Sequence, residues 1–166
     1  MNIKESVMVL KTLDFTLLLG IALGNRKQEA FRAACTLEYM LINDPEKFNR
    51  QVPAFFAALA VVDNPSVMHH FSKIVALLTA QMDKQPLKAL LEPIPKEPII
   101  ELLFTWLINR NLPVAIKVHS MQALANLSKT NDWIANELLE TIDFQEKYES
   151  PAFFARAKHI RKQLKK

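Results

Sequence analysis

The sequence predicts an all-α protein that folds as a right-handed α-α superhelix of about four helix pairs in one domain, residues 1–166. Three observations predict this fold. Proline follows a capping residue at several positions, which is typical of the first turn of a helix. Between these positions apolar residues recur at helical spacing, without sustained alternation of period two. A polar stripe recurs in four of the predicted helices, which indicates a repeated unit.

The helix starts carry the strongest local signals. Five prolines mark predicted starts, three of them directly after a capping residue: Asp44-Pro45, Asn64-Pro65, Ser150-Pro151, Pro98 and Pro113. Asn131 can cap one more helix. Together with the apolar periodicity, these starts predict helices over 2–11, 13–24, 27–43, 45–62, 65–82, 97–110, 113–129, 131–147 and 151–165. The proline-rich segment 83–96 is expected to form a loop with one helical turn at 87–91.

Composition excludes several classes of function. The chain has 2 glycines, too few for a Walker A loop, a dinucleotide fingerprint or a glycine-flanked nucleophile elbow. Its 1 cysteine allows neither an internal disulfide nor a multi-cysteine zinc site, and favours a reducing cytoplasm. The apolar stretch 16–24 is shorter than the ~20 residues that span a bilayer. We therefore expect no membrane segment and no cofactor.

Four predicted helices carry polar or small residues at i, i+4 and i+7, opposite a broad apolar face. These triplets are Arg32/Thr36/Tyr39, His69/Lys73/Ala76, His119/Ala123/Asn126 and Ala155/His159/Lys162. Their first members are separated by 37, 50 and 36 residues, and the long interval contains the proline-rich loop. The spacing indicates a unit of about 40 residues, each a helix pair with its striped helix on the concave side. Opposite the stripes, the expected buried residues are Leu37, Leu78, Leu124 and Ile160.

Four runs carry a resemblance to a known family: residues 32–38, 104–107, 113–124 and 154–158. They resemble short bacterial proteins of the HEAT-like, armadillo-type helical-repeat class, over most of the chain from about residue 26. The resemblance implies stacked HEAT-like helix pairs. Its motifs are packing patterns, so it implies no particular activity. It also implies a structural role for Lys117, because such repeats often pair a cation at this place with an acid of the neighbouring unit.

The concave stripe is the predicted site, and its predicted function is non-catalytic protein binding or scaffolding. It offers cationic and neutral donors and few acids, which favours an acidic or extended peptide segment as the partner of a monomeric protein. The candidate partner-binding residues are Arg32, Thr36, Tyr39, His69, Lys73, His119, Gln122, Asn126, His159 and Lys162. A second interpretation stays open, in which the stripe is only the solvated side of four helices.

Nucleic-acid binding is the alternative function, because the net charge of +4 comes from the basic last seventeen residues. HEAT-like DNA glycosylases of the alkylation-repair class place tryptophans and a carboxylate around a damaged nucleotide. Here Asp132 precedes Trp133, and Glu101 lies five residues before Trp106. Both tryptophans are nevertheless expected to pack inward, and no basic groove extends over several repeats.

No catalytic or metal-binding constellation is predicted. His69, His70, His119 and His159 come from different repeats or point apart, so they are not expected to converge on one site. Cys35 lies on a largely apolar helix with no histidine within a turn, and is expected to be a buried structural thiol. The sequence therefore gives no argument for an enzyme.

Overall fold

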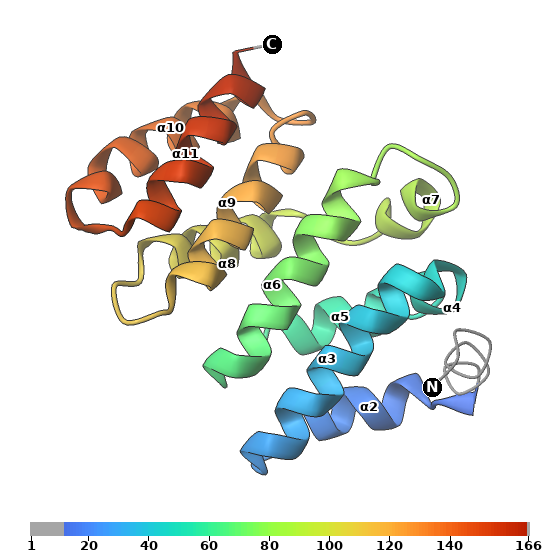
Figure 1. The fold of residues 1–166 in the computed structure, drawn as a ribbon. Coiled ribbons are helices and arrows are strands. Elements are labelled where there is room, and N and C mark those ends of the chain that lie inside the picture. Colours follow the sequence, from blue (N-terminus) through green and yellow to red (C-terminus); the bar gives the residue numbers. More distant parts are fainter. Residues whose placement is uncertain (1–11, 166) are drawn as a thin grey trace.

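The computed structural model describes residues 12–165, which form ten α-helices, a short 3-10 helix and no strand (Figure 1). The helices are α2 (Phe15–Ala22), α3 (Lys27–Asn43), α4 (Pro45–Asn49), α5 (Val52–Leu59), α6 (Pro65–Ala80), α7 (Leu87–Leu91), α8 (Glu97–Ile108), α9 (Val114–Leu127), α10 (Asp132–Gln145), η1 (Glu146–Tyr148) and α11 (Pro151–Leu164). The all-α prediction is confirmed for the described residues. The predicted helix 2–11 lies outside them.

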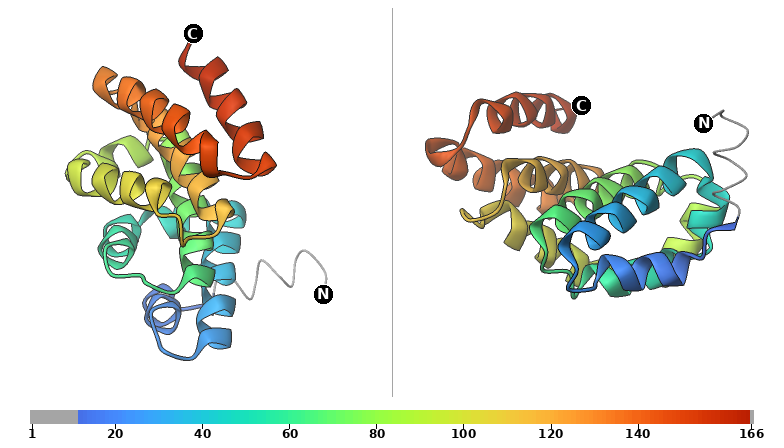
Figure 2. Two further views of the ribbon diagram at one scale, coloured as in Figure 1. Left: turned by 90° about the vertical axis from the view of Figure 1, so that its left-hand side faces the viewer. Right: turned by 60° about the horizontal axis from the view of Figure 1, so that its bottom comes forward.

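The larger helices form two layers. Helices α3, α6, α9 and α11 lie side by side in that order, and we call them the first layer. Helices α2, α5, α8 and α10 form the second layer on one side of it (Figure 2). Within this arrangement α2 packs on α3, α8 packs on α9, and α10 contacts both α9 and α11. The chain therefore alternates between the layers, and every striped helix of the sequence lies in the first layer.

The core lies between the two layers. Leu37, Leu78, Leu124 and Ile160 are at most 1% exposed, which confirms the predicted register of the four striped helices. Trp106 is 4% exposed, so its predicted inward packing is also confirmed. Burying each of these side chains contributes about 1.5–3 kcal/mol to folding.

Two of the four predicted capping side chains make the expected hydrogen bond. The side chains of Asp44 and Asn64 accept hydrogen bonds from the amides of Lys47 and Ser66, as expected of capping residues. Ser150 and Asn131 also precede their helices, but neither side chain makes a capping bond. The predicted turn at 87–91 is present as α7.

The predicted helix 45–62 is wrong as a single element, because it divides into α4 and α5. Pro53 gives the physical reason. Its ring would clash with the carbonyl of Asn49 in a continuous helix, and Asn49 is where α4 ends. In the part of the chain that the structure describes, no helix has the length and apolarity of a membrane span.

One tryptophan differs from the prediction. Trp133 is 54% exposed and stacks on Phe104 with ring centroids 6.5 Å apart, so its predicted inward packing is wrong. The buried stripe of α10 is Ile134, Leu138 and Ile142. Trp133 lies one position before this stripe, about 100° around the helix, and therefore faces outward.

Candidate functional site

A hydrogen-bonded cluster joins α3 to α6 in the first layer, and we call Cys35, Glu38, His70 and Lys73 the polar cluster. Lys73 Nζ lies 2.5 Å from Glu38 Oε1, and His70 Nδ1 lies 2.6 Å from Glu38 Oε2. On the other side of the imidazole, His70 Nε2 lies 3.1 Å from Cys35 Sγ. Cys35 and Glu38 are three residues apart on α3, as are His70 and Lys73 on α6, so each pair shares one helix face.

The electrostatics of the polar cluster are set by burial and by these bonds. Glu38 is 9% exposed, and burial alone would raise the pKa of its carboxyl group. Hydrogen bonds from Lys73 and His70 outweigh burial and lower this pKa, so Glu38 is a carboxylate at neutral pH. Burial, together with the negative charge of Glu38, raises the pKa of the Cys35 thiol. The cysteine therefore rests as a neutral thiol.

The polar cluster corrects the sequence-based interpretation of Cys35. Its side chain is half-buried and bonded to a histidine of the neighbouring helix, so the prediction that the thiol is fully buried is wrong. Glu38 was not predicted as a site residue. Cys35 with His70, and Glu38 with Lys73, are both 35 residues apart. This separation is close to the 37-residue interval between the first two stripes. Residues at equivalent positions in neighbouring units could therefore have been expected to meet, and this is the sequence signal that could have predicted both pairs.

Two more histidines, His69 and His119, lie next to His70 of the polar cluster, although the histidines were expected to stay apart. The ring centroid of His69 lies 5.0 Å from that of His70 and 5.5 Å from that of His119. Burial lowers the pKa of His69. Burial also lowers the pKa of His119 to about 4, helped by the positive charges of His69, Lys73 and Arg156. Among residues 12–165, no three His, Cys, Asp or Glu side chains are placed to hold one metal ion.

Beyond the histidines, α6 and α9 close on each other. Asn126 is 4% exposed, and its amide donates hydrogen bonds of 3.1 Å to the carbonyl of Ala76 and to Thr79 Oγ1. Ala123, in the same stripe, is fully buried. Asn126 Oδ1 accepts hydrogen bonds from Gln122 and from Gln163 of α11. The prediction that Asn126 belongs to an exposed partner-binding surface is therefore wrong, because its polar groups bond to neighbouring side chains and helices.

Between α9 and α11 the first layer stays open. An open pocket of about 600 Å³ is lined by Val114, Ala115, Val118, His119, Ala152, Ala155, Arg156 and His159. Behind it, Gln122 Oε1 accepts a 2.9 Å hydrogen bond from Arg156 Nη1, while Gln122 Nε2 donates a 3.0 Å bond to Gln163 Oε1. Gln122, predicted to contact a partner, thus positions the arginine. We call this opening the α9–α11 pocket.

The remaining predicted residues lie along the same layer. Arg32 and Tyr39 on α3 are exposed, as are His159 and Lys162 on α11. Thr36 is half-buried, and its hydroxyl donates to the carbonyl of Arg32. The exposed members thus lie on the two outermost helices of the first layer.

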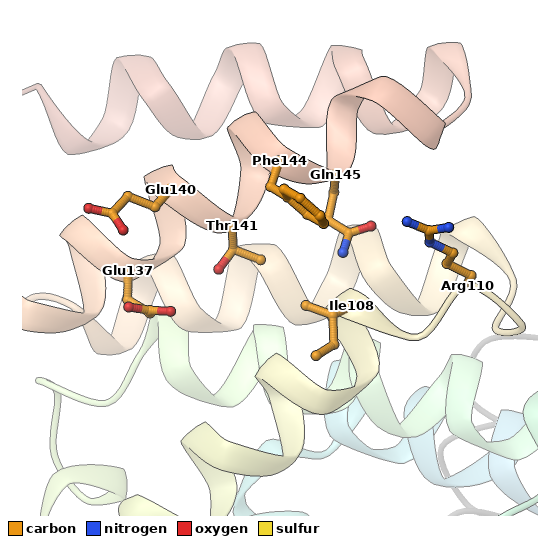
Figure 3. A pocket seen from close by; sticks show the side chains of 7 residues that line it. All are labelled: Ile108, Arg110, Glu137, Glu140, Thr141, Phe144 and Gln145. Atoms are coloured by element: carbon orange, nitrogen blue, oxygen red, sulfur yellow. The ribbon is translucent and has the colours of Figure 1, made fainter.

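A further pocket, which the sequence did not indicate, lies where α8 ends beside α10 (Figure 3). Its volume is about 460 Å³, and its lining residues are Ile108, Arg110, Glu137, Glu140, Thr141, Phe144 and Gln145. The Arg110 guanidinium carbon lies 4.0 Å from the ring centroid of Tyr148. This pocket combines both signs of charge with exposed apolar side chains, whereas no acid among residues 12–165 lines the α9–α11 pocket.

Comparisons with known proteins found no matching family model, no matching curated protein and no matching solved structure. The geometry and charge of these sites are therefore what bears on the function.

Proposed function

We propose that this protein is a non-catalytic binding module built from HEAT-like helix pairs, and that its first layer binds an acidic, extended peptide segment. In this proposal it acts as a monomer in a reducing cytoplasm. Strict alternation of the larger helices between two layers is what stacked helix pairs would produce. It supports the proposed repeat architecture.

The α9–α11 pocket is the observation that carries the proposed partner. Its polar lining is one guanidinium, from Arg156, and two imidazoles, from His119 and His159, and no carboxylate is among its lining residues. The remaining walls are alanine and valine side chains, which leave room for a peptide backbone. An anionic ligand would meet donors there without repulsion.

Arg156 is the proposed anchor for a carboxylate. Arginine keeps its charge at all ordinary pH values and can donate from several nitrogens at once. Gln122 accepts one of these donors and holds the guanidinium in place, which leaves the others for a charge-assisted bond. His119 would contribute hydrogen bonds as a neutral imidazole, because its pKa is about 4.

Fluorescence anisotropy with two labelled peptides tests the proposal. One peptide alternates glutamate and alanine, and the other replaces every glutamate by glutamine at the same length. The glutamate peptide should bind more tightly, and Arg156→Gln should weaken it by about tenfold. Lys158→Ala is the matched control, because Lys158 is exposed on the same helix and is not among the pocket's lining residues.

Equal binding of the two peptides would reject the acidic partner. An equal loss in the Lys158→Ala variant would show that the charge of the helix as a whole, rather than the pocket, attracts the ligand.

The same anisotropy experiment with labelled duplex DNA distinguishes nucleic-acid binding from peptide binding. Two cations of α11 already have partners, because Arg161 contacts Asp143 and Glu146 and Arg156 contacts Gln122. If DNA binds better than the peptide, with a log-log salt slope of about −0.9 for each phosphate neutralised, the module binds nucleic acid and the peptide proposal fails.

A further inference from the structure

The bonds around His70 define which of its nitrogens carries a hydrogen. Glu38 is a carboxylate at neutral pH and can only accept hydrogen bonds, so Nδ1 of His70, 2.6 Å away, must be the donor. In a neutral ring the other nitrogen, Nε2, is then an acceptor. It faces Cys35 Sγ at 3.1 Å, so with a neutral ring the thiol donates its hydrogen to Nε2.

A thiol, an imidazole and a carboxylate linked in this order form a relay for removing a proton. When Cys35 attacks an electrophile, Nε2 can accept the thiol proton, and the resulting imidazolium is stabilised by Glu38. Lys73 holds the other carboxylate oxygen at 2.5 Å, and the ring of Phe31 lies 5.3 Å from the imidazole. These two contacts orient the Glu38 carboxylate and the His70 imidazole.

We propose that Cys35 is an acyl-acceptor site, at which the thiol takes an acyl group from a small thioester with His70 as general base. Glu38 is a positioning residue in this step. The half-buried side chain of Cys35 retains access to solvent for a small reagent. The site is separate from the α9–α11 pocket and does not depend on the proposed peptide binding.

In the proposed step, Sγ forms a bond to the thioester carbonyl carbon while the thiol proton moves to His70 Nε2. The tetrahedral intermediate then collapses, the bond from that carbon to the leaving sulfur breaks, and the imidazolium returns its proton to the leaving thiolate. One thiol and one thioester are consumed and one of each is formed, so the step requires no oxidant or reductant.

The surroundings restrict the chemistry to a single acylation. Cys35 lies in the middle of α3, where backbone amides bond within the helix, so no free amide pair surrounds it among the described residues. Without such donors for the developing oxyanion, rapid turnover is not expected. Peroxide is a poorer reagent than a thioester, because it needs a resting thiolate and Cys35 rests as a thiol.

The test incubates the protein with S-acetyl-N-acetylcysteamine at neutral pH and follows intact mass, with peptide mapping to locate the label. We expect one acetyl group, on Cys35. His70→Asn should slow acetylation by about 100-fold, within the range for loss of a general base. Glu38→Gln should slow it by about tenfold, because the imidazole loses its fixed tautomer. Glu29→Gln, an exposed carboxylate on the same helix, is the matched control and should react as the unmodified protein does.

The pH profile of the unmodified protein gives a second readout that needs no variant. If His70 acts as a general base, the acetylation rate should reach a plateau as the pH is raised, at a pH lower than the raised pKa of the Cys35 thiol. A rate that rises about tenfold per pH unit up to that pKa would reveal an unassisted thiolate and overturn the proposal. Acetylation absent from Cys35, or unchanged in a folded His70→Asn variant, would overturn it as well.

Discussion

Helix α9 has two flanks that differ in how they meet their neighbours. Toward α6, the small side chains of Ala76 and Ala123 are buried, and Asn126 binds across the contact. Toward α11, the α9–α11 pocket stays open, with His119 and Arg156 in its lining. Both flanks come from stripes with the same i, i+4, i+7 spacing.

The difference shows that helix separation decides what a stripe residue does. Small residues let two helices approach closely, which removes the polar groups beside them from solvent. Larger side chains at a contact keep two helices farther apart, and the charged end of a long side chain can remain available to a ligand. Asn126 and His119 belong to the same stripe of α9, yet the first is buried against α6 and the second lines the α9–α11 pocket.

The largest predicted effect concerns the charge pair that joins α9 to the start of α11. Lys117 Nζ lies 2.5 Å from Glu149 Oε1, and both side chains are at most 7% exposed, which confirms the predicted pairing. Lys117→Met should destabilise the protein by about 3–5 kcal/mol in urea unfolding, because it leaves a buried charge unpaired. Adding Glu149→Leu should recover most of this loss. A cost below about 0.5 kcal/mol would mean that α11 is held chiefly by other contacts.

The closed flank should depend on Asn126. Asn126→Ala removes both hydrogen bonds to α6 and should lower the free energy of unfolding by about 1–3 kcal/mol. Ligand binding in the α9–α11 pocket should weaken less than it does in Arg156→Gln. If Asn126→Ala abolished peptide binding in a protein of unchanged Tm, the two flanks would not be functionally distinct.

His119 contacts the ring of His69 on the α6 flank of α9, and it lines the α9–α11 pocket on the other flank. Its pKa is lowered from 6.5 to about 4 in the folded protein, so the unfolded chain binds more protons between these values. Stability should therefore fall as the pH drops through this range, by up to about 2 kcal/mol between about pH 7 and pH 5. Urea midpoints measured across this range check the slope. His119→Asn should flatten it, and an unchanged slope would show that other groups cause it.

The smallest effect is expected at the solvent-exposed charge pairs that Arg161 of α11 makes with α10 and η1. Arg161 contacts Asp143 and Glu146 at 2.5 and 2.6 Å, but it is 30% exposed and Asp143 is 69% exposed. Arg161→Ala should cost less than about 1 kcal/mol, because solvent screens such pairs. The same urea experiment compares it with Lys117→Met. A similar loss of unfolding free energy in both variants would contradict the expectation that burial makes the Lys117–Glu149 pair the stronger one.

Local signals in the sequence predicted much of the fold. The proline-marked starts and the apolar periodicity placed α6, α9 and α11, because a helix is defined by residues close in sequence. Pro53 carries the same kind of local signal for the break between α4 and α5. Trp133 was misassigned because the apolar face of α10 is narrow, and one position decides whether a side chain is buried.

The candidate site was predictable only in part. The stripes indicated which helices share a layer, and they included Lys73, His69 and His119. They omitted Cys35, Glu38 and His70, because no local pattern shows that a side chain will meet one 32 or 35 residues away.

By itself, therefore, the sequence determined the helices and the faces they bury, since both follow from contacts within a few residues along the chain. Only the tertiary structure decided the distance between neighbouring helices. That distance placed Glu38 between His70 and Lys73, buried Asn126 against α6, and left the pocket open beside Arg156. It depends on side chains from different units packing against each other, which no single segment of sequence specifies.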